Sequence, residues 1–331
     1  MLIPIRFLIA AALLVPAVAP AQDPSIGSGQ GFPTRPIRIV VGFPAGGSND
    51  LVARALGARM STTLGQQVLV DNRPGANGII AAEHVMKSPA DGYTVILTGV
   101  STLVLNPLLY PKVPYDTLTD FSPVTTVAAL PQIMVAHPQL PVKSLKELVA
   151  LAQRQPGALT AASPGIGGIS HLTLELFTSL ARVKIEHVAY KGTAPALTDI
   201  VGGQIPLLVC DLPAPLPYVK AGRLRALVVT GPERSPLLPE VATAREQGFT
   251  GLQATNWLGV MAPAKTPPAV VERLNALFVA AVNAPDTRER YATVGVEAAT
   301  FPNSAAFASF LRDEFARWEK VVKQSGVKLT Q

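Results

Sequence analysis

Short apolar segments alternate with amphipathic stretches along the first third of the chain. The apolar segments are rich in β-branched residues, which favours buried strands, whereas the stretches between them repeat apolar residues at helical spacing. Strands are expected at residues 37–41, 67–71 and 93–98, and helices at about 48–64 and 79–87. Strands and helices that alternate at this length predict a parallel sheet, which binds ligands at the carboxyl ends of its strands.

The same alternation restarts past the third strand. Further strands are expected at residues 124–127, 132–136, 159–162, 185–188, 205–210 and 225–230. The chain then crosses back near residues 251–260, which gives it two connections between two units. We therefore predict an α/β protein whose first domain comprises residues 35–128 plus 256–331 and whose second comprises residues 129–255, with the ligand cleft between them.

The first predicted strand ends in a glycine-rich turn, Phe43-Pro44-Ala45-Gly46-Gly47-Ser48-Asn49-Asp50. A helix follows it, and Ser48 is the expected N-cap. Adjacent glycines let backbone N–H groups approach a ligand, and a helix N-terminus adds free donors and the positive end of a dipole. Such a turn favours an anion, typically a carboxylate or a phosphate, although an ordinary strand-to-helix turn can contain the same residues.

A second turn of this kind also lies between a predicted strand and a predicted helix. Its sequence is Ser163-Pro164-Gly165-Ile166-Gly167-Gly168-Ile169-Ser170-His171. Ser101 and Asp211 each follow a strand, so both belong to rims where ligands bind in such sheets. Ser101 is equally a candidate N-cap for the helix after it. Two turns that suit anions, in two α/β units, predict a ligand held between them.

Composition and charge exclude several classes of function. The 331 residues have a net charge of +6, but the lysines and arginines are scattered without a basic block, so no nucleic-acid partner is expected. The single cysteine, Cys210, excludes an internal disulfide. We expect no cofactor and no metal, because His171 and Glu175 share a helix face but have no evident third ligand.

The N-terminal residues have the pattern of an export signal. Arg6 precedes an apolar run, and Ala19-Pro20-Ala21 has the small residues of a cleavage site. We expect a signal peptide at residues 1–21, cleaved after Ala21, and a flexible leader at residues 22–34 that is rich in glycine, serine and proline. The mature protein is therefore expected outside the cytoplasm.

Two classes of enzyme share parts of these motifs. A nicotinamide-dependent enzyme would have G-x-G-x-x-G after its first strand, whereas the glycines here are Gly42, Gly46 and Gly47. A serine hydrolase with Ser170 as nucleophile would need glycine where Leu172 stands. A secreted hydrolase whose catalytic residues meet only in space stays open as an alternative.

Several segments resemble the Bug family, the periplasmic solute-binding receptors of tripartite tricarboxylate transporter systems. The resemblance follows the order of the chain and covers nearly all of its mature part. It is carried by FPAGGSND (43–50), DNRPGANG (71–78), DGY (91–93), LLY (108–110), PYD (114–116), HVAYKG (187–192), GRLRAL (222–227) and RLN (273–275).

This resemblance implies a two-domain Venus-flytrap fold of the type II periplasmic binding protein kind, located in the periplasm. It implies that the chain is not an enzyme but a receptor that captures a small organic acid, a mono-, di- or aromatic carboxylate. The implied partners are the membrane subunits of the transporter, and we expect a monomer. A periplasmic sensor that feeds a two-component system would share the same pocket, and that alternative stays open.

In the Bug family the two glycine-rich loops hold a ligand carboxylate, partly through ordered waters. This chain departs from the family in one place, because Gly168 and Ile169 stand where relatives usually have serine or threonine before the residue matching His171. With the neighbouring residues of the same loops and rims, the expected ligand-binding residues are Phe43, Ala45, Gly46, Gly47, Ser48, Asp50, Asn77, Ser101, Gly165, Gly167, Gly168, Ser170, His171, Tyr190 and Asp211.

Overall fold

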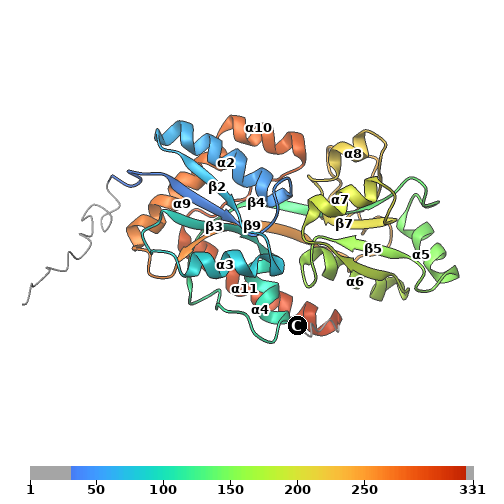
Figure 1. Ribbon diagram of the computed structural model, residues 1–331. Helices are drawn as coiled ribbons and strands as arrows, with labels where there is room; N and C mark the ends of the chain where they lie inside the picture. The colour runs from blue at the N-terminus through green and yellow to red at the C-terminus, as the bar shows by residue number, and fades with distance from the viewer. Residues whose placement is uncertain (1–30, 326–331) are drawn as a thin grey trace, which may run out of the picture.

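The computed structural model describes residues 31–325, and the predicted signal peptide and most of the leader lie outside them. Two lobes lie side by side, each a sheet with helices on both faces (Figure 1). The strands follow the order β2-β1-β3-β9-β4-β7-β5-β6, and β8 pairs with β4. Among the described residues, no helix has both the length and the apolar character needed to cross a membrane.

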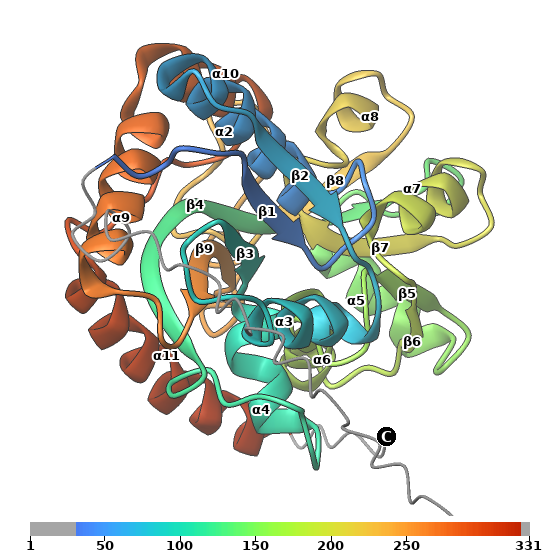
Figure 2. The same cartoon turned by 60° about the vertical axis from the view of Figure 1, so that its left-hand side comes forward.

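The first lobe is built on a sheet in which β1, β2 and β3 are parallel and β9 is antiparallel to β3. Alternate residues of β1 face opposite cores: Ile39 packs towards α2, α9 and α10, and Val40 packs towards α3 and α11 (Figure 2). The elements are β1 (Ile37–Val41), α2 (Ser48–Leu64), β2 (Val68–Asn72), η1 (Ala76–Gly78), α3 (Ile79–Met86), β3 (Thr94–Gly99), η2 (Ser101–Leu105), α4 (Asn106–Leu109), β9 (Thr255–Pro263), α9 (Pro268–Asn283), α10 (Pro285–Val294) and α11 (Ser304–Ser325).

The second lobe repeats this layering on a smaller sheet. Helices α5 and α6 cover one face, and α7 and α8 cover the other. Ser144 is the N-cap of α5, because its hydroxyl accepts a hydrogen bond from the N–H of Glu147. The elements are α5 (Leu145–Arg154), β5 (Thr160–Ser163), α6 (Ile169–Ala181), β6 (Glu186–Ala189), α7 (Thr193–Val201), β7 (Leu207–Asp211), α8 (Leu216–Lys220) and β8 (Arg225–Val229).

One strand, β4 (Phe121–Ala136), runs through both lobes, so the prediction of two separate strands here is wrong. Residues 121–131 pair with β9, and residues 132–136 pair with β7 and β8. Pro131 lies where the pairing changes partners, which is a place where a missing N–H donor is tolerated. The sequence pattern breaks at this proline although the strand continues through it.

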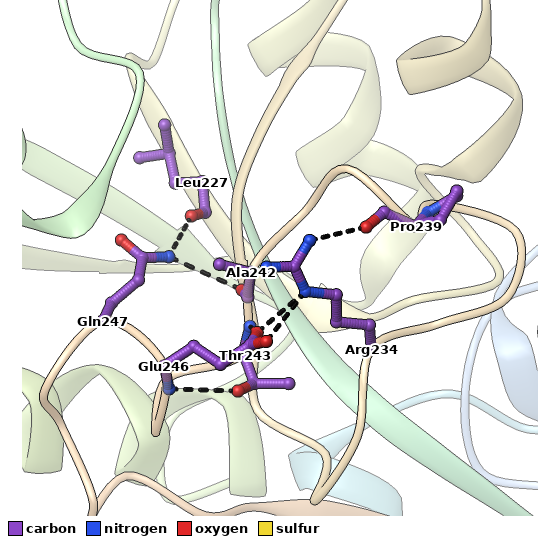
Figure 3. Close-up of polar contacts among 7 residues, drawn as sticks. All are labelled: Leu227, Arg234, Pro239, Ala242, Thr243, Glu246 and Gln247. Carbon is purple, nitrogen blue, oxygen red and sulfur yellow. Dashed lines mark hydrogen bonds and ion pairs between the residues drawn. The ribbon is translucent and has the colours of Figure 1, made fainter.

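The connection from β8 back to β9 is fixed by polar contacts (Figure 3). The Arg234 Nε donates to both carboxylate oxygens of Glu246, at 2.9 and 3.0 Å, and its Nη1 donates to the carbonyl of Pro239 at 2.7 Å. The N–H of Thr243 also donates to Glu246, and Gln247 donates to the carbonyl of Leu227. These contacts fix the path of a long connection that leads the chain back to the first lobe.

Both tryptophans of the chain donate to one buried carboxylate on α11. The Nε1 of Trp257, on β9, lies 2.7 Å from Glu314 Oε2, and the Nε1 of Trp318 lies 3.0 Å from the same oxygen. All three residues are buried, and Arg317 donates to the other carboxylate oxygen of Glu314. Glu314 thereby links the last helix to the strand that returns from the second lobe.

Replacing Glu314 by leucine removes the acceptor for both indole groups. Each buried N–H left unpaired costs roughly 1–3 kcal/mol, so we expect the free energy of unfolding to fall by roughly 2–5 kcal/mol. Urea unfolding followed by circular dichroism measures this loss. The Glu314→Gln variant keeps a carbonyl acceptor and should lose less than half as much; equal losses in the two variants would contradict this role.

Candidate ligand-binding site

A small cavity of about 40 Å³ lies between the two lobes, where the ends of β1 and β3 meet the ends of β5 and β7. An outer chamber of about 490 Å³ adjoins it and shares four of its lining residues. The residues that line the inner cavity are Phe43, Gly47, Ser48, Asn49, Asn77, Gly99, Ser101, Pro164, Gly165, Gly168, Ile169, Ser170, Thr193, Asp211 and Asn256.

The first glycine-rich turn presents the N-terminus of α2 to this cavity. Gly46 takes a φ of +84°, which glycine adopts without strain, and its N–H donates to Asp50 Oδ2 at 2.9 Å. Gly47 has an extended backbone and is the N-cap, so Ser48 is the first helical residue and the prediction of Ser48 as N-cap is wrong. The cap position needs no side chain here, which leaves the Ser48 hydroxyl directed at the cavity.

Asp50 supports this turn from behind. Burial alone would raise the pKa of its carboxyl, but hydrogen bonds from Arg54, Gly46 and Asn72 outweigh burial and lower the pKa below its ordinary value. Asn72 also donates to the carbonyl of Phe43, which ties the turn to β2. The Asp50 carboxylate is therefore occupied within the first lobe and does not line the cavity.

The second glycine-rich turn rests on two stacked imidazole rings. The rings of His171 and His187 are 3.8 Å apart and nearly parallel. His171 Nδ1 accepts from the N–H of Gly167 at 3.0 Å, and His187 Nε2 lies 2.7 Å from the hydroxyl oxygen of Ser163. Because the Ser163 hydroxyl donates to the carbonyl of Gly165, His187 must be the donor to Ser163.

Burial lowers the pKa of His187 to about 4, with a smaller contribution from the facing His171. His187 is thus neutral at physiological pH and serves as a neutral donor behind the turn. The Ser163–His187 pair resembles the contact of a hydrolase, but Ser163 is completely buried and its hydroxyl hydrogen is already used. This pair has no access to a substrate, and it positions the turn.

The two lobes touch across the cavity. The N–H of Ile169, on the second lobe, donates to Ser101 Oγ on the first at 3.0 Å, and the hydroxyl of Tyr110 lies 3.4 Å from the carbonyl of Ile166. Ser101 lies inside the helical turn η2 and does not cap the helix that follows, so the N-cap alternative for it is wrong. Its hydroxyl is free to join the lobes because no backbone N–H of its own helix uses it.

Asp211, at the end of β7, forms the floor of the cavity. It accepts hydrogen bonds from Gln132 and from Asn256 Nδ2, the latter at 3.2 Å to each oxygen. Burial raises the pKa of the carboxyl to about 6, although these hydrogen bonds act in the opposite direction. The hydroxyl of Ser48 lies near enough to favour the ionised form, but it is not aligned for a hydrogen bond.

The fifteen residues expected from the sequence fall into three groups. Nine line the inner cavity, and Tyr190 lines only the outer chamber. The other five line neither the inner cavity nor the outer chamber. They belong to the two glycine-rich turns or to the start of the helices that follow them. These five are Ala45, Gly46, Asp50, Gly167 and His171.

Six lining residues were not expected from the sequence. Asn49, Pro164, Ile169 and Thr193 belong to the two turns and to the start of α7, so attention to whole turns would have found most of them. Gly99 and Asn256 lie side by side, and a Cβ on Gly99 would come 2.6 Å from Asn256 Oδ1. Only the insertion of β9 between β3 and β4 brings Asn256 to the cavity, and no local pattern predicts that insertion. The six are Asn49, Gly99, Pro164, Ile169, Thr193 and Asn256.

Because the pKa of Asp211 is raised in the folded protein, the free energy of unfolding should depend on pH. The folded protein binds this proton more tightly than the unfolded chain does, so stability decreases as pH rises from about 4 to about 6. Asp211→Asn removes this dependence, and its stability relative to the wild type should increase by about 2–3 kcal/mol between pH 4 and pH 7.5. Urea titrations at the two pH values measure the difference; Asp313→Asn, at an exposed position, is the control and should show no such change. An Asp211→Asn difference independent of pH would contradict the argument.

Comparison with known proteins places these features in a family. The model of the tripartite tricarboxylate transporter family receptor matches residues 52–327. Protein BugT of Bordetella pertussis (strain Tohama I) is 36% identical over 299 residues, which cover 90% of this chain and 91% of that protein.

Two solved structures have the same fold. Rpa4515 of R. palustris, with adipate, is 37% identical with a TM-score of 0.87, and the match covers 90% of this chain and 99% of that one. MatC of Rhodopseudomonas palustris, with bound malate, is 34% identical with a TM-score of 0.83, and the match covers 88% and 100%. The Venus-flytrap architecture is thereby confirmed, and the chain belongs to the tripartite tricarboxylate transporter receptor family, of which the Bug proteins are members.

Proposed function

We propose that this receptor captures a small organic acid in the cavity between its lobes, through backbone donors of the two glycine-rich turns. The observation that carries this proposal is that two strand-turn-helix units, β1 with α2 and β5 with α6, face each other across one cavity. The first N–H groups of each helix have no partner within the helix, and the helix dipoles favour an anion there. A carboxylate fits these donors without any arginine or lysine in the cavity lining.

The outer chamber suits the remaining part of such a ligand. Its walls are largely apolar and include Phe43, Pro44, Tyr110 and Ile166. Relatives with bound adipate and malate support a carboxylate as the ligand class of this chain as well. The ligand would be released unchanged to membrane transporter subunits, as for a receptor of this family, and the buried Ser163–His187 pair has no access to it.

Closure would occur about the two strands that cross between the lobes. We propose the domain division expected from the sequence, residues 35–128 plus 256–331 and residues 129–255, with β4 and β9 as the hinge; residues 326–331 lie outside the described part of the chain. We further propose a monomer in the periplasm, formed after removal of residues 1–21. The contact of Ser101 with Ile169 belongs to the closed arrangement and would break on opening.

Calorimetry with mono-, di- and aromatic carboxylates tests the proposed function. At least one acid should bind, stabilise the protein by about 2.7 kcal/mol at a hundredfold excess over Kd, and be recovered unchanged. In Gly47→Val we expect no binding, because the added methyl groups would occupy the approach to the α2 N-terminus. The backbone of Gly47 is extended and a Cβ would meet nothing closer than 3.6 Å, so the fold should be unaffected.

Gly47→Ala is the matched control and should bind more weakly than the wild type but measurably. Circular dichroism and thermal unfolding establish that both variants are folded. Wild-type affinity in Gly47→Val would contradict a ligand held at this turn, and the absence of binding by every acid would contradict the proposed function.

The second turn lacks the hydroxyl that the resemblance to the Bug family implies at this place, and we propose that its absence sets the size of the ligand. Gly168 has a φ of −75°, which serine also adopts, and a Cβ there would lie at contact distance, 3.4 Å from Asn77 Oδ1 and from Ser101 Oγ. We expect Gly168→Ser to tighten binding of a small dicarboxylate roughly tenfold, through one added hydrogen bond to a charged group. It should weaken binding of a bulky aromatic acid, which needs the same space. Titration of both acids into both proteins measures this, and equal shifts for the two acids would contradict the prediction.

A further inference from the structure

Two buried polar atoms in the cavity have no hydrogen-bond partner. Among the described residues, the buried side-chain atoms without a partner are Ser48 Oγ, Asn256 Oδ1 and the hydroxyl of Tyr291. Ser48 and Asn256 line the cavity and are only 3% and 6% exposed, whereas Tyr291 lies in the core between α10 and its neighbours. Buried polar groups are nearly always paired, so the cavity has unused capacity for hydrogen bonds to a ligand.

The contacts of Asn256 show whether the unpaired groups are donors or acceptors. Its Nδ2 donates to both oxygens of Asp211, which fixes the orientation of the amide and directs Oδ1 away as an acceptor. Gln132 does not line the cavity, and both its polar atoms are engaged within the protein: its Nε2 donates to Asp211 and its Oε1 accepts from Ser170. The cavity floor therefore presents the acceptors of Asn256 and Asp211 together with the hydroxyl of Ser48.

The acceptors of Asn256 and Asp211 cannot pair with a bare carboxylate, because a carboxylate has no donor. We propose that the floor formed by Ser48, Asp211 and Asn256 is a subsite for a hydrogen-bond donor on the ligand, so that the receptor takes carboxylates with a hydroxyl or amino group beside the carboxylate. This inference rests on the proposed function and specifies the class of acid.

The position of Ser48 sets where that donor must lie. Its backbone N–H belongs to the α2 N-terminus that receives the carboxylate, and its side chain belongs to the floor. The N–H that binds the carboxylate and the hydroxyl that binds the donor thus belong to the same residue, Ser48. This short separation suits a ligand whose hydroxyl or amino group is on the carbon next to the carboxylate. A cavity of about 40 Å³ admits only a few atoms, since one water needs about 10–15 Å³. The remaining part of the ligand would extend into the outer chamber.

Matched pairs of acids test this subsite. Calorimetry at pH 7.5 compares lactate with propionate and malate with succinate, which differ only in the hydroxyl. We expect the hydroxy acid of at least one pair to bind tenfold or more tightly, as for a hydrogen bond to a charged group. Ser48→Ala should reduce this ratio severalfold. It breaks no aligned hydrogen bond of the ligand-free protein, and circular dichroism with thermal unfolding checks that it is folded.

Asn256→Leu should abolish the ratio, and circular dichroism establishes that it is folded. Ser101→Ala is the control, since Ser101 lines the cavity but its hydroxyl accepts from Ile169 across the lobes, so its loss should weaken both members of a pair equally. Equal wild-type affinities within both pairs would overturn the inference and indicate that water pairs with the floor, while the proposed function would stand. Failure of every acid to bind would overturn both.

Discussion

The antiparallel pairing of β4 with β9 is the constraint on which the other features depend. β9 and the first part of β4 belong to the sheet of the first lobe, and β4 continues into the second. Where it crosses between the lobes, Gln132 on β4 and Asn256 on β9 both donate to Asp211. The same pairing places the N-termini of α2 and α6 opposite each other. A change in the register of this pair would move both helix ends and the cavity floor together.

The two sides of the cavity use different chemistry. The rims offer backbone N–H groups, whose positions are set by glycine turns and by residues behind them such as Asp50 and His171. The floor offers side-chain acceptors, held by the hydrogen bonds among Gln132, Asp211 and Asn256. Backbone donors cannot be altered by substitution without moving the turn, whereas the floor can be altered one side chain at a time. Differences in ligand between related receptors can therefore arise on the floor while the rims stay the same.

Local patterns predicted most of the fold and about half of the site. The strand Ile37–Val41 and the helix Ser48–Leu64 follow from hydrophobic periodicity, which acts over a few residues. The continuity of β4 through Pro131 depends on which strand pairs with each half, and those strands, β9 for the first half and β7 and β8 for the second, lie far away in the chain. Asn256 was not predicted as a site residue for the same reason, because its place at the cavity depends on how β9 pairs with distant strands. His171 was expected on the cavity, but it stacks on His187 behind the turn, a contact that its own helix does not specify.

The place of β9 in the strand order also constrains how the chain can fold. β9 lies between β3 and β4, so the sheet of the first lobe stays incomplete until residues 255–263 are available. Until then the edge of β3 and one edge of β4 expose unpaired N–H and carbonyl groups, the kind of edge on which strands of other chains assemble. Contacts of such long sequence separation form slowly, because loop closure must precede them. The first lobe therefore cannot finish folding until β9 has been synthesised. A fragment that ends before β9 would keep these strand edges exposed and would be prone to aggregate.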